Sequence, residues 1–547
     1  MRTTLLLLGL LALPLDAQRG DREPPLSSGG ELIPEQACYE VMGYRLELSV
    51  DPEARSIEGV CALLGRATEA TQRIALDLDH HLAVRGVSMP TATGARPVEF
   101  EHRDRRIWID LPAELPSGRA FEVDVAYGGT PRVAPRPPWD GGFTWRTTAA
   151  GEPWIATSCQ GQGADLWWPC KDHPSDKPEV MDLVIHVPEG LVCASNGTLE
   201  DTRSEQEGWT TFEWHIANPI SNYNVALNIA PYEVLEHDYE SVTGERFPVM
   251  FWVLPESVEK AREALPHFVD HLRFYEEVCG PYPFRNEKYG IVETPHLGME
   301  HQSIIAYGNR YRLDDDGYDW LHHHELGHEW WANLVTCRDW KDMWVHEGIC
   351  TYMQALYMER TRGHEALVGA MRQYRRGHRN SKPVAPREVT DTYGIYFSMG
   401  GNDIYNKGAC VMHALRYLMG DEAFFVALRR MCYPTEELEA VTDGSQVRFV
   451  DTDDIKDIAE RYHEADLDWF FEGYVHQAAV PELVVEAEDG QLSLAWSGTG
   501  ETVFTMPVPV VVDGELRRVE MPEGRARIPL PEGARYEVDP EGWVLKK

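Results

Sequence analysis

Basic residues are scarce in this sequence, and their scarcity excludes one broad class of partner. Lysine and arginine together number 51 against 89 aspartates and glutamates, so the formal net charge is −38. Proteins that bind nucleic acid neutralise backbone phosphates with clustered lysines and arginines. We therefore expect no nucleic-acid partner. The acidic excess indicates a well-solvated surface, with adaptation to high salt as the alternative.

Long apolar segments are also lacking, so no membrane span is expected. The longest run, from Leu5 to about Leu15, has about 11 residues, whereas a transmembrane helix needs about 20. Arg2 precedes this run and the small residue Ala17 follows it, which is the arrangement of a secretory signal peptide. Residues 1–17 are therefore predicted to be removed by cleavage after Ala17, which leaves a secreted or periplasmic protein.

The ten cysteines include no pair at the CxxC spacing of redox centres and zinc ribbons. Their even number permits disulfides in an oxidising compartment. We expect one or two disulfides, and the spacings do not indicate which cysteines pair. Histidine and carboxylate side chains are left as the donors for a metal site.

The 547 residues divide by their patterning into a leader and three folded regions. Residues 18–36 are polar and rich in Pro, Gly and Ser, which predicts a flexible leader. Alternation of apolar and polar residues over 37–235 indicates an all-β domain. Helical periodicity dominates 236–480. Alternation returns over 481–547 with Asp-Gly turns, which predicts a small β-sandwich and hence a multidomain α+β protein.

The segment LHHHELGHEWW contains HExxH, the strongest chemical signal in the chain. His324 and His328 lie on one face of a helix, so both imidazoles reach one zinc ion. Glu325 lies beside His324, where its carboxylate reaches the metal-bound water. Glu347 follows after 18 intervening residues, in a second helical pattern, and would supply the third ligand. Two nitrogens and one carboxylate leave a coordination position open, as in catalytic zinc sites.

Other motifs accompany this pair of segments: LGMEH at 297–301, YNKGACVMHAL at 405–415 and CQGQGADLWWPCKDHPSDK at 159–177. Together with HELGHEWWANLVT and WVHEG they resemble the aminopeptidase N family of zinc metallopeptidases, which includes leukotriene hydrolase. The resemblance covers about residues 40–480. It implies a saddle-shaped N-terminal β domain and a thermolysin-like, mainly helical catalytic domain. Many members continue into a large helical domain that this chain replaces with strands, which predicts a more open cleft.

The resemblance also implies the catalytic machinery. His324, His328 and Glu347 would hold one zinc ion per chain, and Glu325 would be the general base. Tyr405 would donate a hydrogen bond to the oxyanion of the tetrahedral intermediate. Tyr393 and Tyr396 are rivals for that role, but neither precedes Lys-Gly.

Recognition of the substrate is implied in the same way, with peptides that carry a free amino terminus as the partners. Glu300 would pair with the α-ammonium group and so place the first residue beside zinc. Gln160 would help to bind that residue. Gly298 and Met299 would supply backbone and pocket contacts.

Three positions depart from the family pattern. Leu297 replaces the first Gly of Gly-x-Met-Glu-Asn, His301 replaces its Asn, and His346 replaces the Asn before the third zinc ligand. We expect these changes to alter side-chain preference and pH profile rather than the reaction. One hypothesis is that His301, as a substrate-binding residue, lowers activity below about pH 6 when it becomes charged near the substrate ammonium.

The sequence therefore predicts a zinc-dependent aminopeptidase that releases single residues from peptides. A zinc endopeptidase and a leukotriene-hydrolase-like dual enzyme are the alternatives among enzymes, because both need the same zinc ligands. A catalytically inactive binding scaffold is the alternative from a different class. The sequence does not specify the oligomeric state or the preferred first residue.

Overall fold

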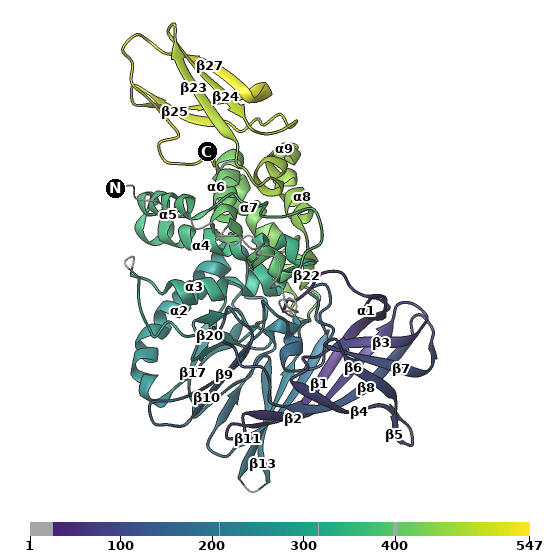
Figure 1. Ribbon diagram of the computed structural model, residues 1–547. Helices are drawn as coiled ribbons and strands as arrows, with labels where there is room; N and C mark the ends of the chain where they lie inside the picture. The colour runs from purple at the N-terminus through teal and green to yellow at the C-terminus, as the bar shows by residue number, and fades with distance from the viewer. Residues whose placement is uncertain (1–25, 207, 315–316, 398–402) are drawn as a thin grey trace, which may run out of the picture.

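A computed structural model describes residues 26–206, 208–314, 317–397 and 403–547. It shows a strand-rich N-terminal domain, a helical domain in the middle and a small β domain at the C-terminal end (Figure 1). This order confirms the expected α+β class. The predicted signal peptide and residues 18–25 lie outside the described residues.

The N-terminal domain is all-β, as the alternation of apolar and polar residues predicted. Its strands are β1 (Tyr39–Asp51), β2 (Ser56–Ala67), β3 (Thr71–Asp77), β4 (Leu82–Thr91), β5 (Gly94–Pro97), β6 (Glu99–Arg103), β7 (Arg106–Leu115), β8 (Ala120–Gly129), β9 (Gly142–Thr147), β10 (Pro153–Ser158), β11 (Val180–Pro188), β12 (Val192–Ala194), β13 (Thr198–Gln206), β14 (Trp209–Ile216) and β15 (Asn228–Ala230).

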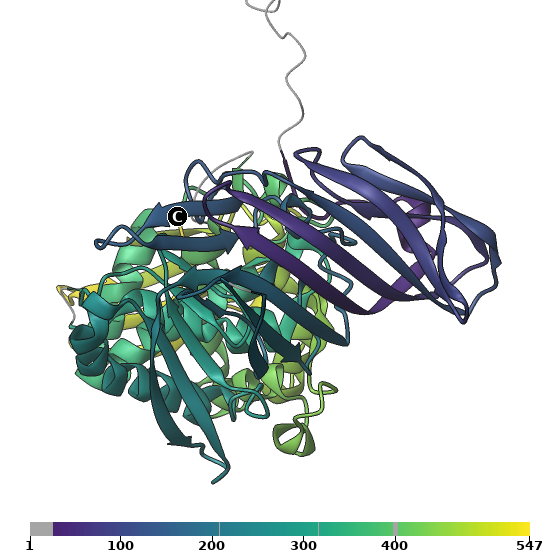
Figure 2. The ribbon, with the colours of Figure 1, turned by 90° about the horizontal axis from the view of Figure 1, so that it is seen from below.

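Its main sheet has eight strands in the order β13-β14-β11-β1-β2-β8-β4-β5. Strand β1 pairs parallel with β11 and antiparallel with β2. Smaller sheets, β3-β7-β6 and β12-β15-β10-β9, complete the domain. Figure 2 shows the long strands, in purple and blue, reaching to one side of the helical domain.

The second domain begins with a five-stranded sheet in the order β16-β17-β18-β20-β19. Its strands are β16 (Glu233–Glu240), β17 (Arg246–Val253), β18 (Tyr289–Glu293), β19 (Gly298–Met299) and β20 (Ile305–Tyr307). The boundary expected between residues 235 and 236 falls inside β16, so this domain starts slightly earlier than predicted. The edge strand β19 carries Gly298 and Met299.

Helices form most of the rest of the second domain, together with a two-stranded parallel sheet of β21 (Val335–Cys337) and β22 (Arg448–Val450). The helices are α2 (Val258–Cys279), α3 (Trp320–Gly327), α4 (Trp344–Arg362), α5 (His364–Gly377), α6 (Gly408–Met419), α7 (Asp421–Cys432), α8 (Thr452–His463) and α9 (Asp468–Phe471). In the described part of the chain, none of the helices is long and apolar enough to cross a membrane.

Helix α4 is the centre of this domain, because every residue from Trp344 to Tyr357 is buried. It crosses α6 where two glycines meet. A Cβ on Gly348 would lie 2.8 Å from the Cα of Gly408. Gly408 belongs to the YNKG segment, so this close crossing brings Tyr405 against α4.

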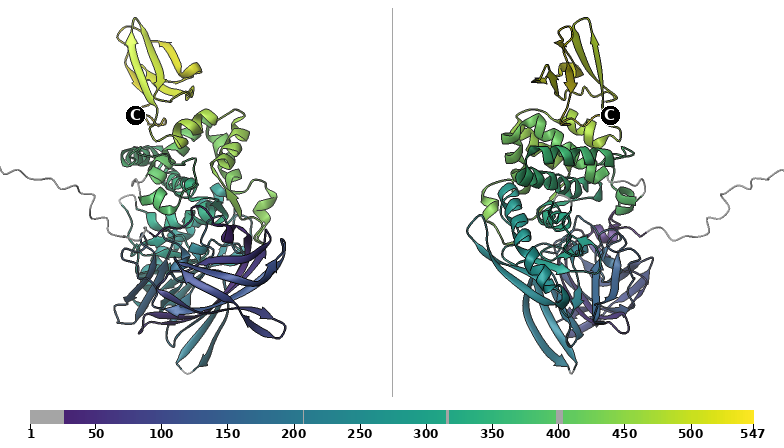
Figure 3. Two further views of the ribbon diagram at one scale, coloured as in Figure 1. Left: turned by 45° about the vertical axis from the view of Figure 1, so that its right-hand side comes forward. Right: turned by 90° about the vertical axis from the view of Figure 1, so that its left-hand side faces the viewer.

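The C-terminal domain is a pair of three-stranded sheets, β23-β24-β27 and β26-β25-β28, around a core of its own. Its strands are β23 (Glu482–Glu488), β24 (Gln491–Ser497), β25 (Val508–Val512), β26 (Glu515–Val519), β27 (Arg525–Pro529) and β28 (Tyr536–Val538). Asp489-Gly490 and Asp513-Gly514 all have positive φ, as type I′ hairpins require. Both predicted hairpins are confirmed. Figure 3 shows this domain at the end of the helices opposite the N-terminal domain.

The prediction of a flexible leader is wrong for residues 26–36. Ser28 is 2% exposed and hydrogen-bonds Thr392, and α1 (Pro34–Ala37) precedes β1. The physical reason is that distant parts of the fold satisfy the polar groups of this segment, which its composition cannot reveal.

The expectation of one or two disulfides is also wrong in this structure. All ten cysteines lie in the described residues as buried free thiols. Burial raises the pKa of Cys350 to about 11 and that of Cys410 to about 12, so both stay protonated at neutral pH.

Candidate metal centre and active site

The HExxH segment forms helix α3 and the turn that follows it. Asp319 caps the helix, since its side chain accepts a hydrogen bond from the backbone N–H of His322. Beyond His328 the backbone leaves helical geometry at Trp331 and Ala332. This turn brings the carbonyl of Trp331 within 3.0 Å of His328 Nδ1. The Nδ1–H then donates to that carbonyl, which leaves Nε2 of His328 available to a metal.

Three donor atoms converge beside this turn. His324 Nε2 lies 3.2 Å from His328 Nε2 and 3.3 Å from Glu347 Oε2. His328 Nε2 lies 3.5 Å from Glu347 Oε2. Zinc bonds of about 2.0–2.2 Å at tetrahedral angles separate ligand atoms by about 3.3–3.6 Å. The donors therefore have the spacing of three corners of a zinc tetrahedron.

The burial and ionisation of Glu347 are those expected of a metal ligand. Its Oε2 atom is buried and has no hydrogen-bond partner, a costly arrangement unless a cation binds there. Burial acts to raise the pKa of Glu347, but His328 and His324 outweigh it and hold the pKa well below its ordinary value. The carboxylate is therefore ionised, and the donor set fits zinc.

Glu325 points into the same space because β19 gives it room. A Cβ on Gly298 would lie 2.5 Å from Glu325 Oε1, so a larger residue here would displace the Glu325 carboxylate. Burial raises the pKa of Glu325 well above its ordinary value, which makes the carboxylate a stronger base. Gly298 thus contributes space for Glu325, a role that the LGMEH motif did not indicate.

Glu300 is 3% exposed and lines the same cleft, close to Glu325 and His328. Gln160 Nε2 donates to Glu300 Oε1, and the hydroxyl of Tyr223 donates to the same oxygen at 3.1 Å. Burial raises the pKa of Glu300 to about 7, with His328 opposing the rise and Glu347 adding to it. A bound ammonium group would favour the ionised form. Tyr223 is a site residue that sequence reasoning missed.

Two tyrosines face the donor atoms. The ring of Tyr405 stacks beside that of His324, with centroids 6.2 Å apart. Burial and the charge of Glu347 raise the pKa of Tyr405 well above its ordinary value, so its hydroxyl stays protonated as a donor. The hydroxyl of Tyr396 donates to Glu347 Oε1 at 2.8 Å. The rival Tyr393 is 39% exposed and does not line the cleft.

The cleft around these groups has a volume of about 540 Å³. Its lining includes Leu297, Met299 and Gln160 beside the metal donors, and Trp139 and Trp320 in exposed positions. No residue of 481–547 belongs to this lining. The C-terminal domain therefore leaves the cleft uncovered, in agreement with the expected openness.

The prediction that His301 binds substrate is wrong in this structure. Its side chain is fully buried, does not line the cleft and has a pKa lowered to about 3 by burial and by His296. Burial likewise lowers the pKa of His346 to about 3, and its Nε2 accepts a hydrogen bond from the N–H of Cys337 at 2.9 Å. Both histidines are neutral members of the core.

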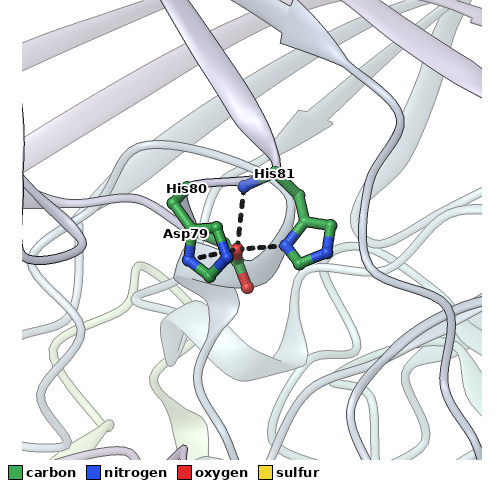
Figure 4. Close-up of side chains that lie close together, drawn as sticks. All are labelled: Asp79, His80 and His81. Carbon is green, nitrogen blue, oxygen red and sulfur yellow. Dashed lines mark hydrogen bonds and ion pairs between the residues drawn. The ribbon is translucent and has the colours of Figure 1, made fainter. Parts of the chain in front are cut away.

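A second group of possible metal donors occurs far from the cleft, in the N-terminal domain. Asp79, His80 and His81 gather around one carboxylate (Figure 4). His81 donates to Asp79 from its backbone N–H and its ring, and Arg132 Nε donates at 2.7 Å. Burial opposes ionisation, but the bonds from Arg132 and His81 lower the pKa of Asp79 to about 2. This carboxylate already has a cationic partner, so we assign no metal to it.

An all-β domain followed by a helical domain with an open two-histidine, one-glutamate centre defines an HExxH metalloprotein of the gluzincin type. Models of one family match both domains. The Peptidase M1 N-terminal domain matches residues 41–224, and the Peptidase family M1 domain matches residues 264–474. The chain belongs to peptidase family M1, the aminopeptidase N family.

Curated relatives agree with this assignment. Endoplasmic reticulum aminopeptidase 1 of Homo sapiens is 27% identical over 65% of this chain and 40% of its own length. Aminopeptidase N of Rattus norvegicus is 24% identical over 63% of this chain and 38% of its own length. Aminopeptidase B of Mus musculus is 25% identical over 71% of this chain and 62% of its own length. The chain thus spans about two fifths of the first two relatives.

Solved structures show the same fold. An M1 zinc metallopeptidase from Deinococcus radiodurans superposes with a TM-score of 0.65 at 22% identity, over 84% of this chain and 97% of that one. A mutant of that protein has been solved with a Tyr-Ser-Ala substrate bound, at the same TM-score.

Proposed function

We propose that this chain is a zinc-dependent aminopeptidase that binds one zinc ion and releases single residues from peptides with a free amino terminus. One observation carries the proposal. Single oxygens of Glu300 and Glu325 and a nitrogen of His328 lie within 4.8 Å of one another. An acid suited to an ammonium group therefore lies directly beside the base and the metal donors.

His324, His328 and Glu347 would hold the zinc ion, which when bound acidifies water and polarises a carbonyl group. Glu325 accepts the proton of the attacking water and passes it to the leaving amine. Tyr405 donates to the oxygen on which negative charge develops. Glu325 is 7% exposed, and its burial strengthens its interactions, because charges interact more strongly where the local dielectric constant is low.

Glu300 would set the cleavage position. In a peptide the α-nitrogen lies about 2.5 Å from the carbonyl carbon of the same residue, and each further residue adds up to about 3.8 Å. An ammonium group held by Glu300 therefore leaves only the first peptide bond within reach of Glu325. Gln160 and Tyr223 orient Glu300 through their hydrogen bonds.

This geometry favours the aminopeptidase over its alternatives. An endopeptidase needs no buried acid beside the metal apart from its ligand and its base, and a further acid such as Glu300 would repel the carbonyl groups of a peptide that continues past the site. An inactive scaffold does not require an unpartnered Glu347 oxygen. The uncovered cleft would admit long peptides.

A decapeptide with a free or an acetylated amino terminus tests the proposal. We expect mass spectrometry to show a ladder of single-residue losses from the free peptide alone. Glu325→Gln and a chelator should each abolish the ladder. Internal cleavage of both peptides would establish an endopeptidase instead, and no cleavage of either by the zinc-loaded protein would favour the scaffold.

We also propose that the protein is exported, because residues 1–17 carry the features of a signal peptide. The mass of the mature protein tests this proposal. Cleavage after Ala17 gives a chain that begins at Gln18, whereas an intact Met1 in the exported fraction would contradict it.

A further inference from the structure

The segment Ser27–Gly30, here named the amino-terminal strap, is docked between parts of the chain that carry active-site groups. Ser28 O accepts a hydrogen bond from the N–H of Thr392 at 3.1 Å. Gly29 forms an antiparallel bridge with Asp391. The side chain of Ser27 accepts from the N–H of Tyr393 at 2.9 Å. The strap therefore fixes the backbone of residues 391–393, which lies 364 residues away in the sequence.

The hydroxyl of Thr392 joins the strap to the substrate side of the cleft. It donates to Gly161 O at 2.5 Å and accepts from the N–H of Ser28 at 3.0 Å. Gly161 follows Gln160, the residue that donates to Glu300. Strap, Thr392 and the Gln160 segment are thus connected by buried hydrogen bonds.

Trp340 provides a second connection from the strap to Glu300. Its Nε1–H points to the Ser28 hydroxyl at 3.3 Å, and its ring lies 5.7 Å from that of Tyr223, a partner of Glu300. The contact is close, because a Cβ on Gly29 would lie 2.3 Å from Trp340 Cδ1. Only glycine permits the strap to dock here.

Tyr396 lies one turn beyond the segment that the strap fixes. Its hydroxyl donates to Glu347 Oε1 at 2.8 Å and lies 3.3 Å from Gln160 Oε1. Glu347 Oε2 is the oxygen directed at the metal position, so Tyr396 holds the other oxygen of the same carboxylate. One hydroxyl thereby touches a metal ligand from one domain and a substrate-binding side chain from the other.

We propose that Tyr396 is a positioning residue for Glu347 and Gln160, and that the amino-terminal strap holds it in place. The inference rests on the proposed zinc site and adds to it. Partners that orient a metal-bound carboxylate typically contribute about 10–100-fold to metal affinity. The strap makes the start of the N-terminal domain part of the support of the catalytic centre.

Zinc affinity, measured by competition with dipicolinate, tests the role of Tyr396 without use of a substrate. We expect Tyr396→Phe to weaken zinc binding by about 10–100-fold. Tyr536→Phe removes a hydroxyl from the C-terminal domain and should leave the affinity unchanged. Equal affinities for wild type and Tyr396→Phe would overturn the proposal. A wild-type protein that binds no zinc would instead overturn the proposed function.

Two neighbouring glycines provide a matched test of the strap. Both have positive φ, so alanine is strained at either position, but a Cβ on Gly30 meets nothing nearer than 3.8 Å. We expect Gly29→Ala to weaken zinc binding by about tenfold, and Gly30→Ala to stay within about twofold of wild type. If Gly29→Ala does not fold, Thr392→Val removes the connecting hydroxyl at nearly constant shape.

The double variant Gly29→Ala/Tyr396→Phe separates positioning from a general loss of stability. If the strap acts through Tyr396, the double variant binds zinc no more than about twofold more weakly than Tyr396→Phe alone. Full additivity of the two effects would contradict this route, as would equal affinities for Gly29→Ala and Gly30→Ala.

Discussion

Histidine and carboxylate donors gather both in the cleft and in the N-terminal domain among the residues that the structure describes, and the two places differ in what surrounds the carboxylate. In the cleft, Glu347 Oε2 is buried without a hydrogen-bond partner between two imidazoles from another helix. In the N-terminal domain the donors come from three consecutive residues, and the Asp79 carboxylate already accepts a hydrogen bond from Arg132 Nε. The number of donors therefore does not define a metal site. A metal site is defined by a buried acceptor that lacks a hydrogen-bond partner and is held in place by rigid elements.

Removal of one histidine from each group should give the largest contrast. His328→Ala removes a donor of the cleft site and should abolish both zinc retention and peptide hydrolysis. His81→Ala should retain wild-type zinc content and rate. Metal analysis after gel filtration, together with a hydrolysis assay, measures both effects. Zinc loss in His81→Ala would break the distinction between the two groups.

Replacement of the base should lower the rate without removal of the metal. Glu325 faces the cleft but is not one of the three converging donors, so Glu325→Gln should keep zinc. Proton transfer by a placed side chain contributes about 10²–10⁴-fold, and we expect kcat to fall by that factor. Steady-state kinetics on the zinc-loaded variant provide the measurement. A kcat near that of wild type would require a different base.

The oxyanion donor should give a smaller effect. Loss of one such donor costs about 10²–10³ in kcat, and we expect this from Tyr405→Phe. The change should fall on kcat more than on KM, because the hydrogen bond strengthens as charge develops. If Tyr396→Phe gave the larger loss of kcat at saturating zinc, the roles of the two tyrosines would be exchanged.

The pH dependence should show that His301 is a core residue. Its pKa is lowered to about 3, so it stays neutral at pH 5–8, and His301→Asn should leave the acidic limb of the rate profile unmoved. A histidine that protonates only when unfolded costs stability as pH falls from about 6.5 towards 3. The free energy of unfolding of the variant should therefore rise relative to that of wild type by about 1.4 kcal/mol for each pH unit of this decrease. Urea unfolding at several pH values measures it.

Asp79 should matter for stability alone. Its pKa is lowered to about 2, so its contribution is present above pH 4 and is lost as pH falls towards 2. We expect Asp79→Asn to lower the free energy of unfolding by about 1–2 kcal/mol at pH 7 and to leave the zinc content unchanged. His80→Ala, at an exposed side chain, should stay within about 0.5 kcal/mol of wild type.

Local patterns in the sequence were enough for the order of domains and the core of the site. Alternation predicted the N-terminal strands, Asp-Gly pairs predicted two hairpins, and HExxH placed His324 and His328 on one helical face. Glu347 needed the resemblance as well, because its approach depends on the packing of α4.

Contacts between distant segments could not be predicted in this way. The docking of Ser28 on Thr392 joins residues 364 apart and has no local signature. The burial of His301 depends on the elements that enclose it rather than on its place in LGMEH. Tyr396 was considered only as a rival of Tyr405, since its contact with Glu347 arises from the fold.

Anomalous diffraction at the zinc absorption edge, from crystals of the zinc-loaded protein, tests the central claim most directly. We predict one strong peak between His324 Nε2, His328 Nε2 and Glu347 Oε2, and none beside Asp79. A peak beside Asp79 and His81, or the absence of a peak from the cleft, would contradict it.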